Sequence, residues 1–322
     1  MAMTFPIPPG TRDVLPDEMR ELRAISERLR GAFERAGYAE LWTPALEYEE
    51  VLRRGDGRAA GAGYRLFDEK GNVLALRSDM TIPIARVVAS RSGGSEPPFR
   101  LCYFGHAHRA ATPGVSREFF QAGIELIGAP APEGDAEVAA LTISALDEAG
   151  LRRHRLGVGD GMLYRALLDA LEVPDVSRQT LLGRLSQRDL AGLELEIDRL
   201  RLPASARELL IGLPGLRGGP EVLDRADGPI GTAVEGLRGL HELLAERGVA
   251  DRVIFDLGLV RDLDYYTGMV FEVYDPAVGF ALGGGGRYDD LIGRFGDPRP
   301  ACGAALDVQR VHLAQAAEER LR

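Results

Sequence analysis

The chain has 322 residues, of which 45% are hydrophobic and 27% charged, and its formal net charge is −10. This length allows one large domain or two ordinary ones, and the composition is typical of a soluble globular protein. The sequence has no apolar run of about 18 residues or more, and its amino terminus lacks a basic region followed by a long apolar one. It therefore predicts neither a membrane span nor a secretory signal, and it favours a cytoplasmic protein.

The charge balance argues against nucleic acid as a partner. The pI is near 5.2, and Lys70 is the single lysine of the sequence. Proteins that grip nucleic acid usually carry basic patches that release condensed counterions. A local arginine patch would still be compatible with RNA binding, so the sequence lowers this expectation without removing it.

The first third of the chain predicts a helix, a strand and a hairpin. Apolar residues recur at helical spacing over 17–37. The stretch 37–55 predicts a strand that carries Leu41 and Trp42 and is interrupted at Pro44. A hairpin over 64–79 with its turn at 69–72, and a helix that begins at a capping Asp79, follow.

The rest of the chain predicts strands at both ends of a long helical region. In chain order we expect strands over 99–109 and 117–128, a helix over 132–150, a short strand over 154–160 and a helix over 161–173. An inserted helical region over 174–247, strands over 250–274, and a strand, glycine loop and short helix over 279–296 follow. The last stretch, 301–322, predicts a strand or turn that continues into a terminal helix. The layout predicts an antiparallel α+β domain that helices interrupt.

The stretch "VRDLDYYTGMVFEVY" at 260–274 changes character halfway through. Its second half alternates as a half-buried strand does. Its first half gathers one guanidinium, two carboxylates and two phenols, which is too polar for core filling. These side chains belong to Arg261, Asp262, Asp264, Tyr265 and Tyr266. The sequence therefore predicts a binding site at the beginning of this strand.

Two further stretches place polar groups at alternate positions. Arg77, Asp79 and Thr81 would share one face of a strand and would suit the carboxylate and ammonium of an amino acid, although Asp79 alone is equally a helix cap. Gln121 and Glu125 likewise share one face of their strand, and the alternative there is an ordinary exposed polar face.

The glycine run "GGGGRYDD" at 283–290 lacks the lysine and hydroxyl of a phosphate loop. We interpret it as a flexible turn whose glycines allow close approach of a ligand or a neighbouring strand, with Tyr288 delivered beside the site.

Cysteine and histidine show no metal or nucleophile pattern. Cys102 and Cys302 lie far apart without a CxxC context, so two buried thiols are expected and a disulfide stays open. His106 and His108 share one predicted strand face but lack a third ligand. The sequence also lacks HExxH and GxSxG. It therefore predicts no metal, no cofactor and no catalytic residue.

Taken together, these stretches resemble one family over nearly the whole chain. The following seven occur in the order seen in the catalytic domain of histidyl-tRNA synthetases: "PPGTRDVLP", "GYAELWTPALE", "LALRSDMT", "REFFQAGIELIG", "VRDLDYYTGMVFE", "GGGGRYDDL" and "ACGAALDVQR". The resemblance implies a class II aminoacyl-tRNA synthetase-like core, in which helices flank an antiparallel sheet, with a helical insertion and a homodimer.

Carried over by position, the resemblance also implies a pocket for L-histidine. Acidic and amide groups would hold the ammonium, Arg109 or Arg261 the carboxylate, and the tyrosines and a remaining acid the imidazole. The implied residues are Asp79, Thr81, Arg109, Gln121, Glu125, Arg261, Tyr265, Tyr266 and Tyr288.

Departures from the synthetase pattern point to a regulatory relative. "RSDMT" stands where synthetases have Arg-Pro-Glu-x-Thr, and Ala111 and Val115 replace an acid and an arginine that handle ATP. Arg310 is retained within "LDVQR", and we expect no anticodon-binding domain of the kind that synthetases carry after this core. We therefore expect a single synthetase-like domain over 1–322, with the insertion at 174–247.

With these departures the chain resembles the regulatory subunits of ATP phosphoribosyltransferase. That resemblance implies a subunit of histidine biosynthesis without catalysis of its own, which assembles with the short catalytic subunit into a hetero-octamer, activates it and takes part in feedback inhibition by histidine. The alternative is a stand-alone histidyl-tRNA synthetase-like enzyme that activates an amino acid with ATP, since Arg261 and Arg310 are retained.

Overall fold

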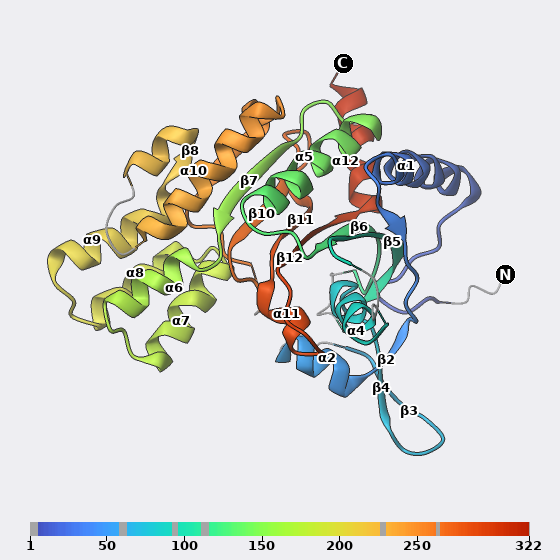
Figure 1. The fold of residues 1–322 in the computed structure, drawn as a ribbon, viewed down its shortest axis with the longest axis horizontal. Helices are drawn as coiled ribbons and strands as arrows, with labels where there is room; N and C mark the ends of the chain where they lie inside the picture. Colours follow the sequence, from blue (N-terminus) through green and yellow to red (C-terminus); the bar gives the residue numbers. More distant parts are fainter. Residues whose placement is uncertain are drawn as a thin grey trace.

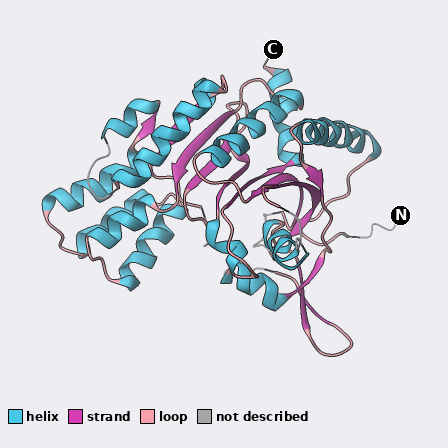
Figure 2. Cartoon of the chain, viewed as in Figure 1, coloured by secondary structure: helices cyan, strands magenta, loops and turns pink. Residues whose placement is uncertain are grey.

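The computed structural model describes residues 6–57, 63–91, 96–110, 116–225, 230–261 and 265–321. Among these residues, the strands form one nine-stranded and one three-stranded sheet, and helices lie on both faces of the larger one (Figures 1 and 2). The larger sheet has the order β1-β5-β6-β12-β11-β10-β7-β9-β8. The fold class is α+β, as the sequence predicted.

The centre of the large sheet is antiparallel. It consists of β5 (Phe99–His108), β6 (Glu118–Ile127), β12 (Ala301–Asp307), β11 (Ala281–Arg287), β10 (Met269–Tyr274) and β7 (Arg155–Asp160). Parallel pairing occurs only towards the edges of the described sheet, between β1 (Ala39–Glu40) and β5 and between β7 and β9 (Val253–Asp256). The predicted antiparallel sheet is therefore mixed, because its edge strands arrive through crossovers.

Three helices cover one face of the sheet: α1 (Pro16–Arg35), α5 (Glu133–Glu148) and α12 (Val308–Arg320) (Figure 1). Leu22, Ile25, Leu29 and Phe33 of α1 point into the main core. They meet the even-numbered residues of β6, such as Ile124. The apolar spacing that predicted the first helix is thus the face that packs on the sheet.

A smaller core lies on the opposite face, beneath α2 (Glu49–Gly55), α4 (Thr81–Arg91) and α11 (Asp289–Gly293). The three-stranded sheet of β2 (Leu46–Tyr48), β4 (Val73–Leu76) and β3 (Arg65–Phe67) borders it. The β3–β4 hairpin projects from the body of the molecule (Figure 1). Its turn is the predicted one, because Asp68 accepts hydrogen bonds from the backbone N–H groups of Lys70 and Asn72.

The predicted strand around Leu41 and Trp42 is shorter than expected. β1 ends at Glu40, although the backbone N–H of Leu41 still donates to the carbonyl of Cys102 at 2.8 Å. Trp42 lies outside any strand, and 89% of its surface is exposed. The following Thr43 and Pro44 lie in an irregular stretch that leads to β2, so proline ends the pairing here.

The region predicted as helical over 174–247 contains α7 (Asp175–Ser186), α8 (Leu190–Arg199), α9 (Ala204–Gly212) and α10 (Gly231–Glu246). It also contains β8 (Arg217–Gly218), which pairs with β9 and which the sequence did not indicate. α6 (Leu163–Ala170) connects β7 to this region. Its role as an insertion in one domain stays a prediction.

No helix within the described parts of the chain is both long and apolar enough to cross a membrane. Cys102 and Cys302 are buried free thiols, as the default interpretation predicted.

Candidate functional site

Eight of the nine predicted histidine-site residues line one cavity of about 410 Å³, a volume that includes the solvent at its mouth. The cavity lies over the central strands, on the face opposite α1, α5 and α12. Glu125, the ninth residue, lies just beneath this lining and bonds to two residues of it. The eight residues are Asp79, Thr81, Arg109, Gln121, Arg261, Tyr265, Tyr266 and Tyr288.

The Glu125 carboxyl is the buried centre of the site. It is 1% exposed, Thr81 Oγ1 donates to its Oε1 at 2.7 Å, and the Tyr288 hydroxyl donates to its Oε2. Burial raises the pKa of Glu125 to about 8, against the opposite effect of these two hydrogen bonds, and the nearby Asp79 raises it further. The Glu125 carboxyl is therefore largely protonated at neutral pH.

Asp79 combines the two roles that the sequence left open. Its Oδ1 accepts from the backbone N–H of Ile82 at 2.8 Å and so caps α4. Its Oδ2 accepts from the Tyr265 hydroxyl at 3.1 Å and belongs to the cavity wall. Burial raises the pKa of Asp79, while its hydrogen bonds and the charge of Arg109 lower it. The cap holds the carboxylate in place for the site.

Arg77 does not share a face with Asp79 and Thr81, so this part of the prediction is wrong. β4 ends at Leu76, and α4 begins at Thr81, so strand alternation does not apply between them. Arg77 is 5% exposed and donates to the carbonyls of Pro44 and His106, at 3.1 and 2.8 Å. Its guanidinium fastens three chain segments together instead of facing the cavity.

The phenol rings form a buried cluster beside the two carboxyls. The ring centroids of Tyr265 and Tyr266 are 5.0 Å apart, and those of Tyr265 and Tyr288 are 5.8 Å apart. Tyr103 of β5 lines the cavity too, although the sequence analysis did not select it. The signal was present, because an antiparallel pairing of 99–109 with 117–128 brings Tyr103 opposite Gly123 on the polar face.

The glycine run is a strand and not the predicted loop. Gly283 to Gly286 pair with β10 on one side and β12 on the other. A Cβ atom on Gly284 would overlap the Arg261 guanidinium and the Phe271 carbonyl. One on Gly303 of β12 would overlap the Glu125 carboxyl. These glycines therefore leave the room that the site's charged side chains occupy, as the close-approach interpretation predicted.

Two arginines connect this cavity to a second one of about 600 Å³. Arg109 and Arg261 line both cavities, and Arg310 lines the second. Arg261 donates from Nη1 to the Phe271 carbonyl at 3.2 Å and lies over the Tyr266 ring. Glu272 and Asp307 also line the second cavity, so this end carries three arginines against two carboxylates. The combined space thus pairs a carboxyl and phenol end with an end of excess positive charge, which suits a zwitterionic amino acid.

Comparisons with known proteins identify the family of this chain. A family model described as histidyl-tRNA synthetase matches residues 10–311. The ATP phosphoribosyltransferase regulatory subunit of Desulforamulus reducens is 41% identical over 314 residues, which cover 95% of this chain and 78% of that protein. Its counterpart from Moorella thermoacetica is 39% identical and covers 98% of this chain and 84% of that protein. The chain belongs to the family of ATP phosphoribosyltransferase regulatory subunits, which share the histidyl-tRNA synthetase fold.

Solved structures confirm the class II fold of the family. A Bacillus halodurans protein described as an ATP phosphoribosyltransferase regulatory subunit/histidyl-tRNA synthetase superposes with a TM-score of 0.91 at 33% identity, over 98% of this chain and 84% of that one. A histidine–tRNA ligase subunit from Alicyclobacillus acidocaldarius gives a TM-score of 0.84 at 32% identity, with 99% of both chains covered.

Four residues that the sequence analysis named lie outside the described residues. They are Ala111 and Val115, which depart from the synthetase pattern, and Asp262 and Asp264, which precede Tyr265 and Tyr266 in the sequence. Arg310 is described: its Nη1 donates to the Ala281 carbonyl at 2.8 Å and its Nε lies 3.4 Å from Asp307.

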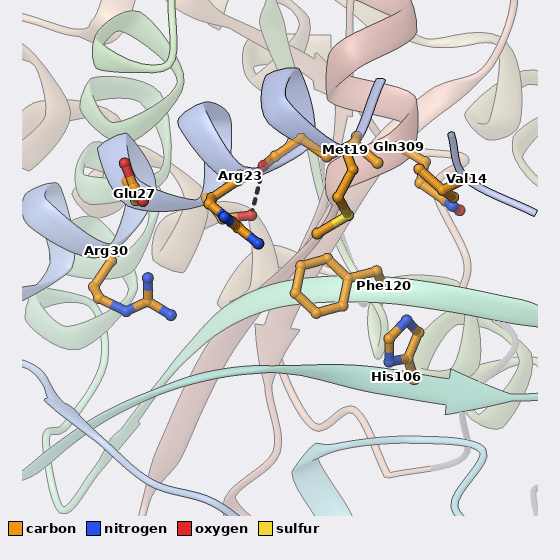
Figure 3. Close-up of a pocket in the computed structure, with 10 residues that line it drawn as sticks. Val14, Met19, Arg23, Glu27, Arg30, His106, Phe120 and Gln309 are labelled. Atoms are coloured by element: carbon orange, nitrogen blue, oxygen red, sulfur yellow. Dashed lines mark hydrogen bonds between the residues drawn. The ribbon is translucent and has the colours of Figure 1, made fainter. Parts of the chain in front are cut away.

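A larger hollow of about 860 Å³ lies on the opposite face of β5 and β6, beside α1 (Figure 3). Met19, Arg30, His106 and Phe120 are among its lining residues. His106 and Phe120 occupy the even-numbered strand positions, whereas Gln121 and Glu125 are odd-numbered. The lining of this hollow lacks the buried carboxyl and phenol groups found at the smaller cavity, so the smaller cavity is the better candidate site.

Proposed function

We propose that this chain is a non-catalytic regulatory subunit of ATP phosphoribosyltransferase that binds L-histidine and activates a short catalytic subunit in the first step of histidine biosynthesis. One observation carries the histidine proposal: in a member of this family, a buried carboxyl cluster and two arginines border the same cavity. A free amino acid has an ammonium, which the carboxyl cluster can hold, and a carboxylate, which the two arginines can hold.

The residues would divide the ligand between them. Asp79, Gln121 and Glu125 would receive the ammonium, and Arg109 or Arg261 the carboxylate. The tyrosine cluster would surround the imidazole and hydrogen-bond its nitrogens. Charge-assisted hydrogen bonds contribute roughly 1.5–3 kcal/mol each, which is enough for micromolar affinity after the ordering costs are subtracted.

Glu125 gives this proposal a specific electrostatic mechanism. Its proton prevents two buried negative charges, those of Glu125 and Asp79, from lying close together. An arriving ammonium favours the carboxylate and so displaces that proton. Asp79 stays held by the α4 cap and by Tyr265 throughout. The site therefore exchanges a proton for a cation instead of leaving a charge unpaired.

The second candidate function is a histidyl-tRNA synthetase-like enzyme that activates an amino acid with ATP. The observation in its favour is the adjoining cavity, whose lining includes Arg109, Arg261 and Arg310 beside Glu272 and Asp307. Arg310 is engaged with the Ala281 carbonyl and Asp307 and lies over the Phe280 ring. Histidine-dependent pyrophosphate exchange above background would establish this enzyme activity.

We further propose that the cytoplasmic chain is one domain with its insertion at 174–247, and that it pairs with a second copy of itself. Exposed apolar side chains support the pairing, because large exposed patches mark interaction sites. They lie on the three-stranded sheet and on the segment that leads to it: Trp42, Leu46, Tyr48, Leu66 and Phe67.

The main proposal is tested with the purified chain and a short ATP phosphoribosyltransferase subunit. Calorimetry should show saturable L-histidine binding, and pyrophosphate exchange should stay at background. Gel filtration should show a complex, and the catalytic rate should rise when this chain is added. Absence of a complex and an unchanged rate at a molar excess of this chain would refute the regulatory function.

A further inference from the structure

Glu272 of β10 has its two carboxyl oxygens turned towards different parts of the molecule. Oε1 lies 3.9 Å from Nη1 of Arg261, a pocket residue. Oε2 accepts a hydrogen bond from the Tyr274 hydroxyl and lies 3.6 Å from Nη2 of Arg188. Since Arg188 stands between α7 and α8, this carboxylate links the pocket to the helical region.

Arg188 fixes the turn between α7 and α8 against the sheet. Its backbone is left-handed, with φ +54, a conformation that non-glycine residues adopt rarely and that needs support from its surroundings. Its Nη2 donates to the Tyr274 hydroxyl at 2.9 Å, and its Nη1 lies 3.7 Å from Asp256 of β9. These side-chain contacts join the turn to β9 and β10.

A second arginine of the helical region reaches the same cluster. Arg217 of β8 pairs in register with Asp256, and its Nε lies 3.9 Å from the Asp256 carboxylate. Its guanidinium carbon lies 5.5 Å from the centroid of the Tyr274 ring. Arg188 and Arg217 of the helical region thus lie against the group formed by Asp256, Glu272 and Tyr274. Arg261 of the pocket lies near the same group through Glu272.

We propose that Glu272 is a positioning residue that couples occupation of the pocket to the attachment of the α7–α8 turn. The inference rests on the proposed histidine binding and names a route for its regulation. A ligand carboxylate at Arg261 competes with Glu272 for the guanidinium. Arg261 and Glu272 lie 3.9 Å apart, beyond a hydrogen bond but within ion-pair distance, so the cost of displacing Glu272 depends on how firmly Arg188 and Tyr274 hold the same carboxylate.

Once Arg261 turns to the ligand, the charge of Glu272 is left to Arg188 and Tyr274. Ligand binding therefore strengthens the contact that holds the α7–α8 turn. By reciprocity, loss of the Arg188 contact leaves Glu272 free to compete for Arg261 and weakens ligand binding by the same factor. A partner protein that stabilises or disrupts the attachment of this turn would likewise raise or lower histidine affinity.

The test is a double-mutant cycle on histidine affinity with Arg188→Gln and Glu272→Gln. Arg188→Gln should weaken binding by roughly 5-fold or more, the lower end of typical couplings, and the effect should vanish in the Glu272→Gln background. Tyr274→Phe keeps the ring but removes the bridging hydroxyl, so it should act in the same direction. The matched control is Arg199→Gln on α8, whose guanidinium pairs with Glu196 at 2.8 Å and should leave affinity unchanged.

Hydrogen exchange supplies a second measurement. Histidine should slow exchange of the α7–α8 turn in the wild type and in Arg199→Gln, but not in Arg188→Gln. If the wild type binds no histidine, the proposed function itself fails. If the wild type binds histidine and Arg188→Gln binds it equally well, or is weakened equally in both backgrounds, the route through Glu272 is wrong while the pocket stands.

Discussion

Thr81 and Glu125 lie 44 positions apart in the sequence and are joined by a hydrogen bond of 2.7 Å. This contact ties the first turn of α4 to the centre of β6, directly under the proposed histidine site. The Tyr288 hydroxyl completes the arrangement from the beginning of α11. Because the carboxyl between them is buried, its protonation should report on the ligand, and two predictions follow from it.

The first prediction is that histidine binding releases a proton. The pKa of Glu125 is about 8, so the group is largely protonated at pH 7, and a bound ammonium would favour its ionised form. Affinity should therefore rise between pH 7 and 8. Calorimetry at pH 7 in two buffers of different ionisation enthalpy should show release of close to one proton. Binding heats that do not depend on the buffer would contradict this mechanism.

The second prediction concerns stability without ligand. The pKa of Glu125 is raised from 4.5 in the unfolded chain to about 8 in the folded one. Its stabilising contribution is thus fully present below about pH 4.5 and is lost as the pH rises to about 8. The glutamine side chain of Glu125→Gln stays neutral at every pH. At pH 8 the free energy of unfolding of this variant should therefore exceed that of the wild type by a few kcal/mol, at about 1.4 kcal/mol per pKa unit.

Thermal melts at pH 5 and pH 8 would measure this effect of Glu125→Gln. The gain in stability of Glu125→Gln over the wild type should be larger at pH 8 than at pH 5. The same substitution should abolish histidine binding. Glu50→Gln is the control, because the side chain of Glu50 is 79% exposed and should show no such pH dependence. A gain of equal size at both pH values would show that burial of the charge is not its source.

The polar face of β6 could be predicted from sequence because strand alternation is a local property. Gln121 and Glu125 fall on one face, and the structure places both at the site. The capping role of Asp79 was likewise predicted from a local pattern, whereas its place at the site was predicted from the family resemblance. The roles of Arg77 and Glu272 depend on carbonyls and guanidinium groups brought together by the fold, which no local spacing encodes.

The strand at Gly283 to Gly286 was misread for a related reason. Glycine has low strand propensity, so local reasoning favours a turn. In the fold, neighbouring backbone and the Arg261 side chain occupy the space where side chains would stand. Tertiary packing therefore overrides the local preference for a turn. The predicted close approach of neighbouring groups to these glycines is confirmed, whereas the predicted loop is wrong.

The third prediction follows from this packing. Gly284→Ala should displace the Arg261 guanidinium and crowd the Phe271 carbonyl, so histidine affinity should fall at least 10-fold, with a stability loss of about 1–3 kcal/mol. Gly279→Ala is the matched control, since a Cβ there meets open space. Calorimetry and thermal melts of both variants would distinguish them. Unchanged affinity in Gly284→Ala would mean that Arg261 does not hold the ligand.

The fourth prediction concerns the residue beside Tyr288. Arg287 is 3% exposed, and its Nε donates at 2.8 Å to Asp135, which is 4% exposed. Arg287→Met would leave that carboxylate buried and unpaired, so we expect a loss of roughly 3–5 kcal/mol in unfolding free energy. The double variant Arg287→Met/Asp135→Leu should recover most of it. Denaturant titration measures both, and no recovery would show that packing, rather than charge, sets the cost.

The last prediction concerns feedback. A ligand shifts an assembly only through its different affinities for the assembly's states, so a histidine site on a non-catalytic chain acts by biasing its partner. In a mixture with the short catalytic subunit, histidine should inhibit the rate. Tyr266→Ala should relieve part of this inhibition while assembly is preserved, because its ring lies under Arg261. Tyr266→Phe keeps the ring and should stay closer to the wild type. Inhibition curves and gel filtration test this, and full inhibition of a Tyr266→Ala complex would place the inhibitory site elsewhere.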